Sequence, residues 1–201
     1  AAVIQFQEAA RHGKPIRNLF LHLGYSRLQL GQNKAAQEDF QRELTHHPDS
    51  YGALANLSSL HFMNRSMDSA IYYGSRAIEV RPFMPSAYIS VGQAYYLRGD
   101  LARSESVFTA GSMKCGEAFL YGNYLLGGIC LERGDAKRAE SLYRSILVPG
   151  ERSGEASYEA EFLMSEEKRT GIDPPMLRAK AFYGLGHVLA GRKQIDSSVA
   201  Y

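Results

Sequence analysis

The sequence has no tryptophan, and it has only two cysteines and seven prolines among its 201 residues. Two thiols cannot form the disulfide framework that stabilises many small secreted domains. In a helical reading, Cys115 and Cys130 lie roughly 15–20 Å apart at 1.5 Å of rise per residue, which is beyond the reach of a disulfide. We therefore expect two separate thiols that pack as small, buried or half-buried residues.

Charge of one sign and long apolar runs are scarce as well. The net charge is +2 and acids and bases are interspersed, so no basic stripe is present that would neutralise a phosphate backbone. The longest apolar stretch, 124–131, is too short and too rich in glycine to span a bilayer, and no signal peptide is recognisable. We expect no nucleic-acid partner, no membrane insertion and a soluble chain, with a cytoplasmic location slightly preferred over a periplasmic one.

Enzyme and metal-site patterns are missing too. His46 and His47 have no further ligands at the spacing of an HExxH or CxxC motif. The neighbouring glycines at 127–128 and 184–186 do not follow a strand, so close helix packing explains them better than nucleotide binding does. We therefore predict a protein that is not an enzyme, with no catalytic residues, no metal and no cofactor.

What the sequence does contain is a period of 34 residues. It relates three pairs, with a fourth pair one residue late: Leu23-Gly24, Leu57-Ser58, Val91-Gly92 and Leu126-Gly127. A second column consists of Ala36, Ala70, Ser104 and Ala139, and a third consists of Phe40, Gly74, Phe108 and Tyr143. A fixed period of this length is typical of stacked repeat arrays, in which each unit buries its apolar face against its neighbours.

These columns resemble the tetratricopeptide repeat (TPR) family, whose units carry a large residue, Leu-Gly and Tyr, followed by Ala, an aromatic residue and Pro. The first unit has Phe20, Leu23, Gly24, Ala36, Phe40 and Pro48, and the third has Tyr88, Val91, Gly92, Tyr95, Ser104 and Phe108. Four units in phase cover residues 17–153. The resemblance implies an all-α fold, an α-solenoid in which antiparallel helix pairs stack into a right-handed superhelix with a concave groove.

The residues alone also predict helix pairs. Apolar residues recur at helical spacing, and the halves of each unit are separated by breaks at Gly31-Gln32, Asn64-Arg65, Gly99-Asp100 and Gly134-Asp135. At these breaks a glycine can supply the positive φ that ends one helix, and Asp or Ser can cap the next.

We predict a single repeat domain over residues 1–201. Its parts are the second helix of a truncated repeat at 1–16, repeats at 17–50, 51–84, 85–118 and 120–153, an inserted helix and loop at 154–175, and a partial repeat at 176–201. Ends that fall inside repeat units indicate a fragment of a longer repeat protein. A complete protein with degenerate terminal repeats is the alternative.

The stretch 149–178 interrupts the period and leaves two interpretations. Its middle, 156–168, is helix-forming, and it can be a helix inserted before a fifth repeat or a degenerate first helix paired with 175–190. The first-helix pattern of Phe182, Leu185 and Gly186 favours the insertion. In that case the partner helix of the last repeat begins near Gln194.

Gly74 is the one small residue in a column of large aromatic residues. A glycine inside a helix costs about 1 kcal/mol relative to alanine, and a missing side chain can leave a void. We expect Gly74→Ala to raise stability, and a neighbouring backbone packed directly on Gly74 would reverse the sign.

The resemblance implies that the first helix of each unit lines the groove. Carried onto this sequence, the candidate peptide-binding residues are Leu21, Tyr25, Asn56, Ser59, Phe62, Ile89, Gln93, Tyr96, Tyr121, Tyr124, Tyr183 and His187. Members that grip a C-terminal carboxylate have Lys, Arg and Asn at such positions, whereas here only Asn56 fits loosely. Aromatic residues dominate binding hot spots, so the set predicts an apolar or amphipathic peptide or helix as ligand.

Three functions compete. The first is a non-enzymatic protein–protein interaction scaffold that binds a segment of a partner protein or of its own full-length chain. The second is the substrate-positioning repeat region of a larger enzyme, for example a glycosyltransferase or a peptidase. The third, helical-repeat RNA recognition, is disfavoured by the 34-residue step and the mild charge. The sequence indicates neither the identity of the partner nor the oligomeric state.

Overall fold

The structure, a computed structural model, describes residues 18–147 and 174–199. These residues form nine α-helices and one short 3-10 helix, with no strand among them, which confirms the all-α prediction. The chain divides into two compact units, of which the first ends at Asp100 and the second begins at Leu101. The predicted helix at 1–16 and the inserted segment up to residue 173 lie outside the described residues.

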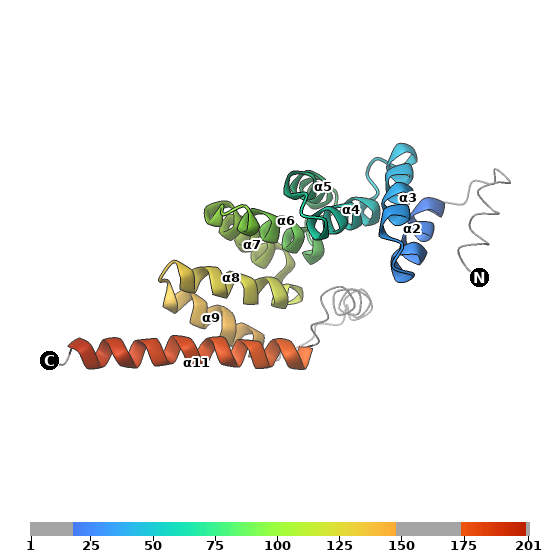
Figure 1. The fold of residues 1–201 in the computed structure, drawn as a ribbon. Coiled ribbons are helices and arrows are strands. Elements are labelled where there is room, and N and C mark those ends of the chain that lie inside the picture. The colour runs from blue at the N-terminus through green and yellow to red at the C-terminus, as the bar shows by residue number, and fades with distance from the viewer. Residues whose placement is uncertain (1–17, 148–173, 200–201) are drawn as a thin grey trace. The chain divides into compact units, whose positions relative to one another are not determined.

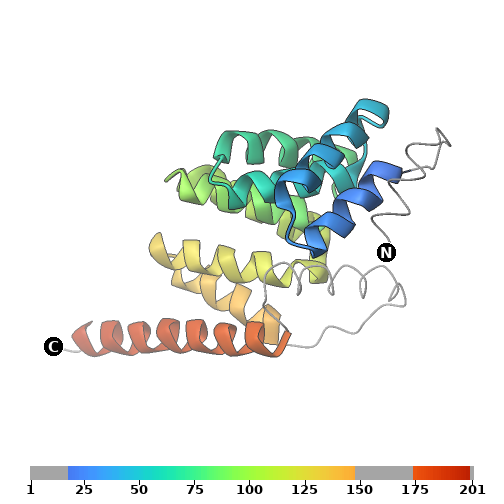
Figure 2. The same ribbon diagram turned by 45° about the vertical axis from the view of Figure 1, so that its right-hand side comes forward.

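The described residues of the first unit, 18–100, form five helices that pack in the order of the sequence (Figures 1 and 2). They are α2 (Leu19–Gln29), α3 (Asn33–His46), α4 (Tyr51–Met63), α5 (Met67–Val80) and α6 (Pro85–Leu97). The antiparallel pairs α2–α3 and α4–α5 fall within the predicted repeats 17–50 and 51–84. Helix α6 packs on α5 and α4 as the first helix of the next repeat.

Each first helix ends in the same hydrogen-bonded turn. At the end of α2 the amide of Gln32 donates to the carbonyl of Arg27 (2.9 Å) and the amide of Gly31 donates to that of Leu28 (3.0 Å), which is the Schellman pattern. The same bonds recur after α4, α6 and α8. The residues with positive φ in these turns are Gly31, Arg65, Gly99 and Gly134. Three of these four residues are glycines. Arg65 is the exception, and its side chain makes the positive φ unfavourable.

Side-chain capping of the second helices is confirmed at one break. The Asp135 carboxylate accepts a hydrogen bond from the amide of Arg138 (3.0 Å), which satisfies one free donor in the first turn of α9. Ser66, at the equivalent place before α5, makes no such bond.

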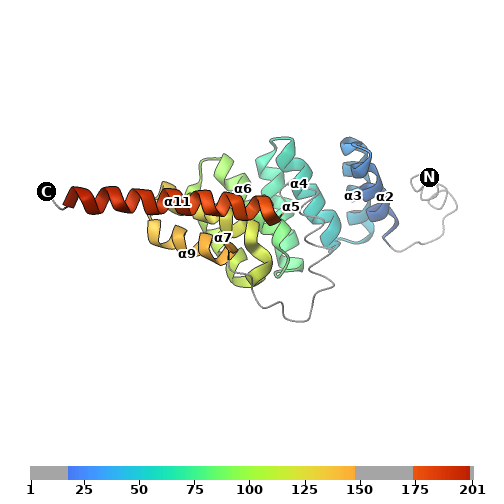
Figure 3. The ribbon, with the colours of Figure 1, turned by 90° about the horizontal axis from the view of Figure 1, so that it is seen from below.

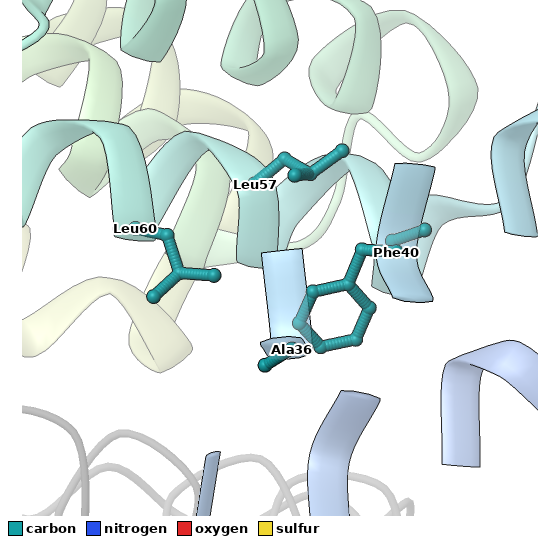
Figure 4. Close-up of a cluster of buried hydrophobic side chains, with 5 residues drawn as sticks. Ala36, Phe40, Leu57 and Leu60 are labelled. Atoms are coloured by element: carbon teal, nitrogen blue, oxygen red, sulfur yellow. The ribbon is translucent and has the colours of Figure 1, made fainter. Parts of the chain in front are cut away.

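The core of the first unit contains the residues of the repeat columns. One cluster joins Ala36, Phe40, Ala53, Leu57 and Leu60 (Figure 4), and a second joins Leu54, Ala55, Ala77 and Ala87. Small residues allow the helices to approach: a Cβ placed on Gly24 would lie 2.7 Å from two ring carbons of Phe40. The aromatic side chain of α3 therefore fills the space left by the glycine of α2.

The packing at Gly74 reverses the sequence expectation. A Cβ at this position would collide with Cγ2 of Val91 and lie 2.7 Å from Oγ of Ser58. No void is present at Gly74, because the β-branched Val91 side chain of α6 occupies the space and can move little. The substitution Gly74→Ala is therefore expected to destabilise the protein.

The second unit begins with α7 (Leu101–Cys115), which a 3-10 turn (Gly116–Phe119) connects to α8 (Leu120–Glu132). This turn lies in the interval where the repeat step lengthens by one residue. Phe119 is fully buried against Phe108, with ring centroids 6.4 Å apart. Helix α9 (Ala136–Leu147) then pairs with α8, and Cys115 and Cys130 are free thiols.

The last helix differs from the predicted partial repeat. Helix α11 (Pro174–Val199) is continuous where a second helix was expected near Gln194, and it packs on α9 and α8 (Figures 1 and 3). Among residues 175–191 of this helix, the buried ones are Leu177, Ala181, Gly184 and Val188. Phe182 and Gly186 of the predicted motif are exposed instead, because the register that buries Ala181 and Gly184 lets α11 approach Tyr143 closely.

No helix among the described residues has the length and apolar composition needed to cross a membrane.

Candidate functional site

The first helices of the first unit, α2, α4 and α6, carry most of the predicted groove residues. Tyr25, Ser59 and Gln93 occupy one repeat position, 34 residues apart, and Phe62 and Tyr96 occupy another, three residues further along. Tyr25 and Tyr96 are about two fifths exposed. Phe62, Ser59 and Gln93 are half-buried.

Direct contacts join α2 to α4 at this surface. Leu21 and Tyr25 cover Gly52, where a Cβ would lie 2.8 Å from the Tyr25 hydroxyl oxygen. The Asn56 amide donates to the carbonyl of Gly52 (2.7 Å) and also hydrogen-bonds Tyr25. Burial raises the pKa of Tyr25, and the bond to Asn56 partly offsets the rise. Because its amide is engaged in this way, Asn56 does not present the free donor that a C-terminal carboxylate clamp requires.

Hydroxyl pairs join α4 to α6. The Tyr51 hydroxyl and Ser86 Oγ lie 2.6 Å apart, and Ser59 Oγ and Ser90 Oγ lie 3.2 Å apart. These bonds fix the spacing of the two first helices along most of their length.

One predicted groove residue is buried, and two exposed apolar residues lie next to the remaining ones. Ile89 is only 2% exposed, since it packs inside the unit, so it offers no surface to a ligand. Met63 and Leu97 are exposed at the C-terminal ends of α4 and α6 and continue the apolar surface next to Phe62 and Tyr96. The family resemblance assigns Met63 to the groove, and Leu97 lies 34 residues further along, so the period could have identified Leu97 as well. We define the first-helix surface as Tyr25, Ser59, Phe62, Met63, Gln93, Tyr96 and Leu97.

The predicted groove residues of the second unit fall on two helices. On α8, Tyr121 and Tyr124 stack with ring centroids 6.5 Å apart, and Tyr124 also packs against the buried Tyr143 at 6.1 Å. Burial, with a smaller contribution from Tyr124, raises the pKa of Tyr143 to about 12. On α11, Tyr183 and His187 are exposed and pack edge to face at 4.5 Å.

A shallow hollow of about 220 Å³ lies on the second helices of the first two repeats, α3 and α5. Its lining comes from α3 and α5 and consists of Gln41, Leu44, Thr45, Tyr72, Tyr73 and Arg76. Tyr73 stacks on His61 of α4 at 5.4 Å, and burial lowers the pKa of that imidazole. Sequence reasoning did not identify this hollow, because its residues lie outside the positions that the family resemblance assigns to the groove.

Buried charges in the first repeat connect α2 to α3. Asp39 is almost fully buried and forms an ion pair with Arg27 (2.9 Å). Burial raises the pKa of Asp39, and the charge of Arg27 opposes the rise. Glu43 accepts a hydrogen bond from the amide of Leu21 (3.3 Å) in the first turn of α2, where a carboxylate is favourable. These acids have a structural role, and the described residues contain no cluster of three or more His, Cys, Asp or Glu that could hold a metal.

Solved structures share this fold across most of the chain. The thermophilic TPR protein TTC0263 of Thermus thermophilus is 17% identical over 81% of this chain and 89% of its own, with a TM-score of 0.57. MamA from Desulfovibrio magneticus RS-1 is 17% identical over 83% of this chain and 86% of its own, with a TM-score of 0.62. Another MamA structure is 15% identical over 90% of this chain and 93% of its own, with a TM-score of 0.58. At these identities the matches demonstrate a common fold.

The sequence profile of the tetratricopeptide repeat family matches residues 21–85, which include both helix pairs α2–α3 and α4–α5. Members of this family generally serve as protein-interaction scaffolds. The columns of the 34-residue period, the consecutive antiparallel helix pairs and this match agree, and residues 21–85 consist of tetratricopeptide repeats.

Proposed function

We propose that the protein is a non-enzymatic interaction scaffold and that its first-helix surface binds an apolar or amphipathic segment of a partner protein. The observation that carries the proposal is the chemistry of this surface. Tyr25, Met63, Tyr96 and Leu97 expose apolar or aromatic area around the neutral side chains of Ser59 and Gln93. None of the seven residues of the surface is charged, which favours an uncharged or apolar ligand face over a phosphate or a carboxylate.

The rigidity of the three helices supports the same function. The bonds between Tyr51 and Ser86 and between Ser59 and Ser90, together with the packing of Tyr25 on Gly52, hold the surface in place before a ligand arrives. A preformed surface lowers the entropy cost of binding. Amphipathic helices are recognised in this way, through apolar side chains spaced three or four residues apart.

Selection from a phage-displayed library of random peptides tests the proposal even though the partner is unidentified. Enriched peptides should carry apolar residues at helical or extended spacing and little net charge. Their affinity, measured by calorimetry, should fall by about 1–4 kcal/mol in Tyr96→Ala, as is typical of an aromatic hot spot.

Tyr72→Ala is the matched control, because Tyr72 is an exposed tyrosine on α5 that lines the hollow of the second helices. Thermal melting of both variants ensures that they are compared at similar stability. An affinity loss in Tyr72→Ala but not in Tyr96→Ala would move the binding site to the hollow, and a library without enriched peptides would contradict the proposal.

A further inference from the structure

Helix α11 is apolar on two opposite sides. One side packs on α9 and α8 through Leu177, Ala181 and Val188. The opposite side exposes a second apolar strip, which we call the outer face of α11. It consists of Ala179, Phe182, Tyr183, Gly186, Leu189 and Ala190. Phe182 is 63% exposed and Tyr183 is 73% exposed.

Such a strip is unusual for the free surface of a helix. A helix that is apolar all round is normally buried on all sides, and contiguous exposed apolar patches mark interaction sites. In Figures 1 and 3, α9 lies along one side of α11, and no other described helix of the second unit covers the opposite side. We therefore expect a further element to pack on the outer face of α11.

Charge indicates what kind of element fits. The sequence of α11 carries four bases and one acid: Arg178, Lys180, Arg192, Lys193 and Asp196. A second copy of α11 would bring further positive charge against the same helix, which disfavours self-pairing. An acidic amphipathic helix has the complementary charge.

The chain itself contains such a segment immediately before α11. Between residues 155 and 168 the only base is Lys168, and the acids are Glu155, Glu159, Glu161, Glu166 and Glu167. Four large apolar residues are interspersed with them: Tyr158, Phe162, Leu163 and Met164. These residues lie outside the described part of the chain, and their sequence predicts a helix at 156–168.

We propose that the acidic segment 155–168 folds as a helix and docks antiparallel on the outer face of α11. The short stretch 169–173 connects it to Pro174, so its local concentration at α11 is in the millimolar range typical of short linkers. An antiparallel arrangement places residues at equal distances from this connection side by side. Leu163 is then level with the neighbourhood of Ala179, which lies between Arg178 and Lys180.

The absence of tryptophan from the chain gives a direct test. Phe162→Trp in the 201-residue protein introduces a single indole whose emission and acrylamide quenching report its burial. We expect blue-shifted emission and weak quenching in the monomer. A second substitution, Tyr183→Asp on the outer face, should shift the emission to the red and raise the quenching constant several-fold.

Met113→Asp is the matched control, since Met113 is an exposed apolar residue on α7 of the same unit. This change should leave the indole protected. Because surface charge attraction is screened by salt, quenching should also rise moderately with ionic strength.

Light scattering at several protein concentrations shows whether the indole is protected in the monomer or only in a dimer. A fully quenched indole in the monomer would overturn the proposal. Protection that appears only when the protein dimerises would overturn it as well, because the outer face would then bind a second copy. The same result would leave the proposed function of the first-helix surface untouched, since the peptide-binding assay uses residues of the first unit only.

Discussion

The first two repeats fill the space between their first and second helices with side chains of different size. In α2–α3 the first helix contributes Gly24 and the second contributes the large Phe40, which fills the space over the glycine. In α4–α5 the first helix contributes Ser58 and the second contributes Gly74, and the space is filled from α6 by Val91. Ser58 also donates a hydrogen bond to the carbonyl of Ala70 (2.8 Å). These repeat positions are therefore constrained together, so that one departure from the pattern compensates another.

The largest expected effect on stability is at the contact between Gly24 and Phe40. Phe40→Ala removes a fully buried ring that contacts Gly24 and packs edge to face with Tyr25 at 5.7 Å. The cavity should cost about 3–5 kcal/mol of unfolding free energy, measured by urea denaturation with helical circular dichroism. Phe83→Ala, in the exposed connection between α5 and α6, is the control and should change little. An equal loss in both variants would show that Phe40 has no special role in the core.

At the contact between Gly74 and Val91, enlarging a side chain should lower stability. Gly74→Ala adds one methyl group where Val91 and Ser58 leave no room, and overpacking of this kind costs about 1–3 kcal/mol. Val91→Ala should relieve the clash, so the double variant should lose less stability than the sum of the two single variants.

Gly128→Ala provides the control for helix propensity, because a Cβ at Gly128 in α8 meets no atom within 4 Å. This change should gain up to about 1 kcal/mol. A stability gain of the same size in Gly74→Ala would contradict the close packing of Val91 and Ser58 on Gly74.

The smallest effect concerns the turns that end α2 and α4. Gly31 and Arg65 occupy the same position with φ of 71° and 61°, and a side chain is unfavourable there. Arg65→Gly should therefore raise stability by about 0.5–1 kcal/mol, and Gly31→Ala should lower it by a similar amount. Thermal unfolding of both variants measures the two changes, and shifts in the same direction would refute the explanation.

Much of the fold could be predicted from the period because helices and their ends depend on near neighbours. The breaks at Gly31, Gly99 and Gly134 were correct, since the Schellman turn involves only residues within one turn of the helix end. The predicted aromatic side chains Tyr25 and Tyr96 are exposed on first helices, as the family resemblance implied. Whether they bind a ligand stays a prediction.

The predictions that failed depended on residues distant in the sequence. Ile89 is buried although its repeat position was assigned to the groove, because α6 packs on both α4 and α5. The motif at Phe182, Leu185 and Gly186 was plausible locally, but the register that packs Gly184 on Tyr143 places Phe182 and Gly186 on the exposed side. The hollow on α3 and α5 also escaped prediction, since it combines residues from different repeats.

The helix pairs, their turns and the resemblance to tetratricopeptide repeats could be read from the residues alone, because a 34-residue period repeats local propensities, caps and apolar spacing. The packing of the helices in three dimensions sets which large side chain fills each small position, which face of α11 is buried and which first-helix residues reach the surface. The physical reason is that close packing joins residues from several helices at once, so the space available at one position depends on side chains tens of residues away.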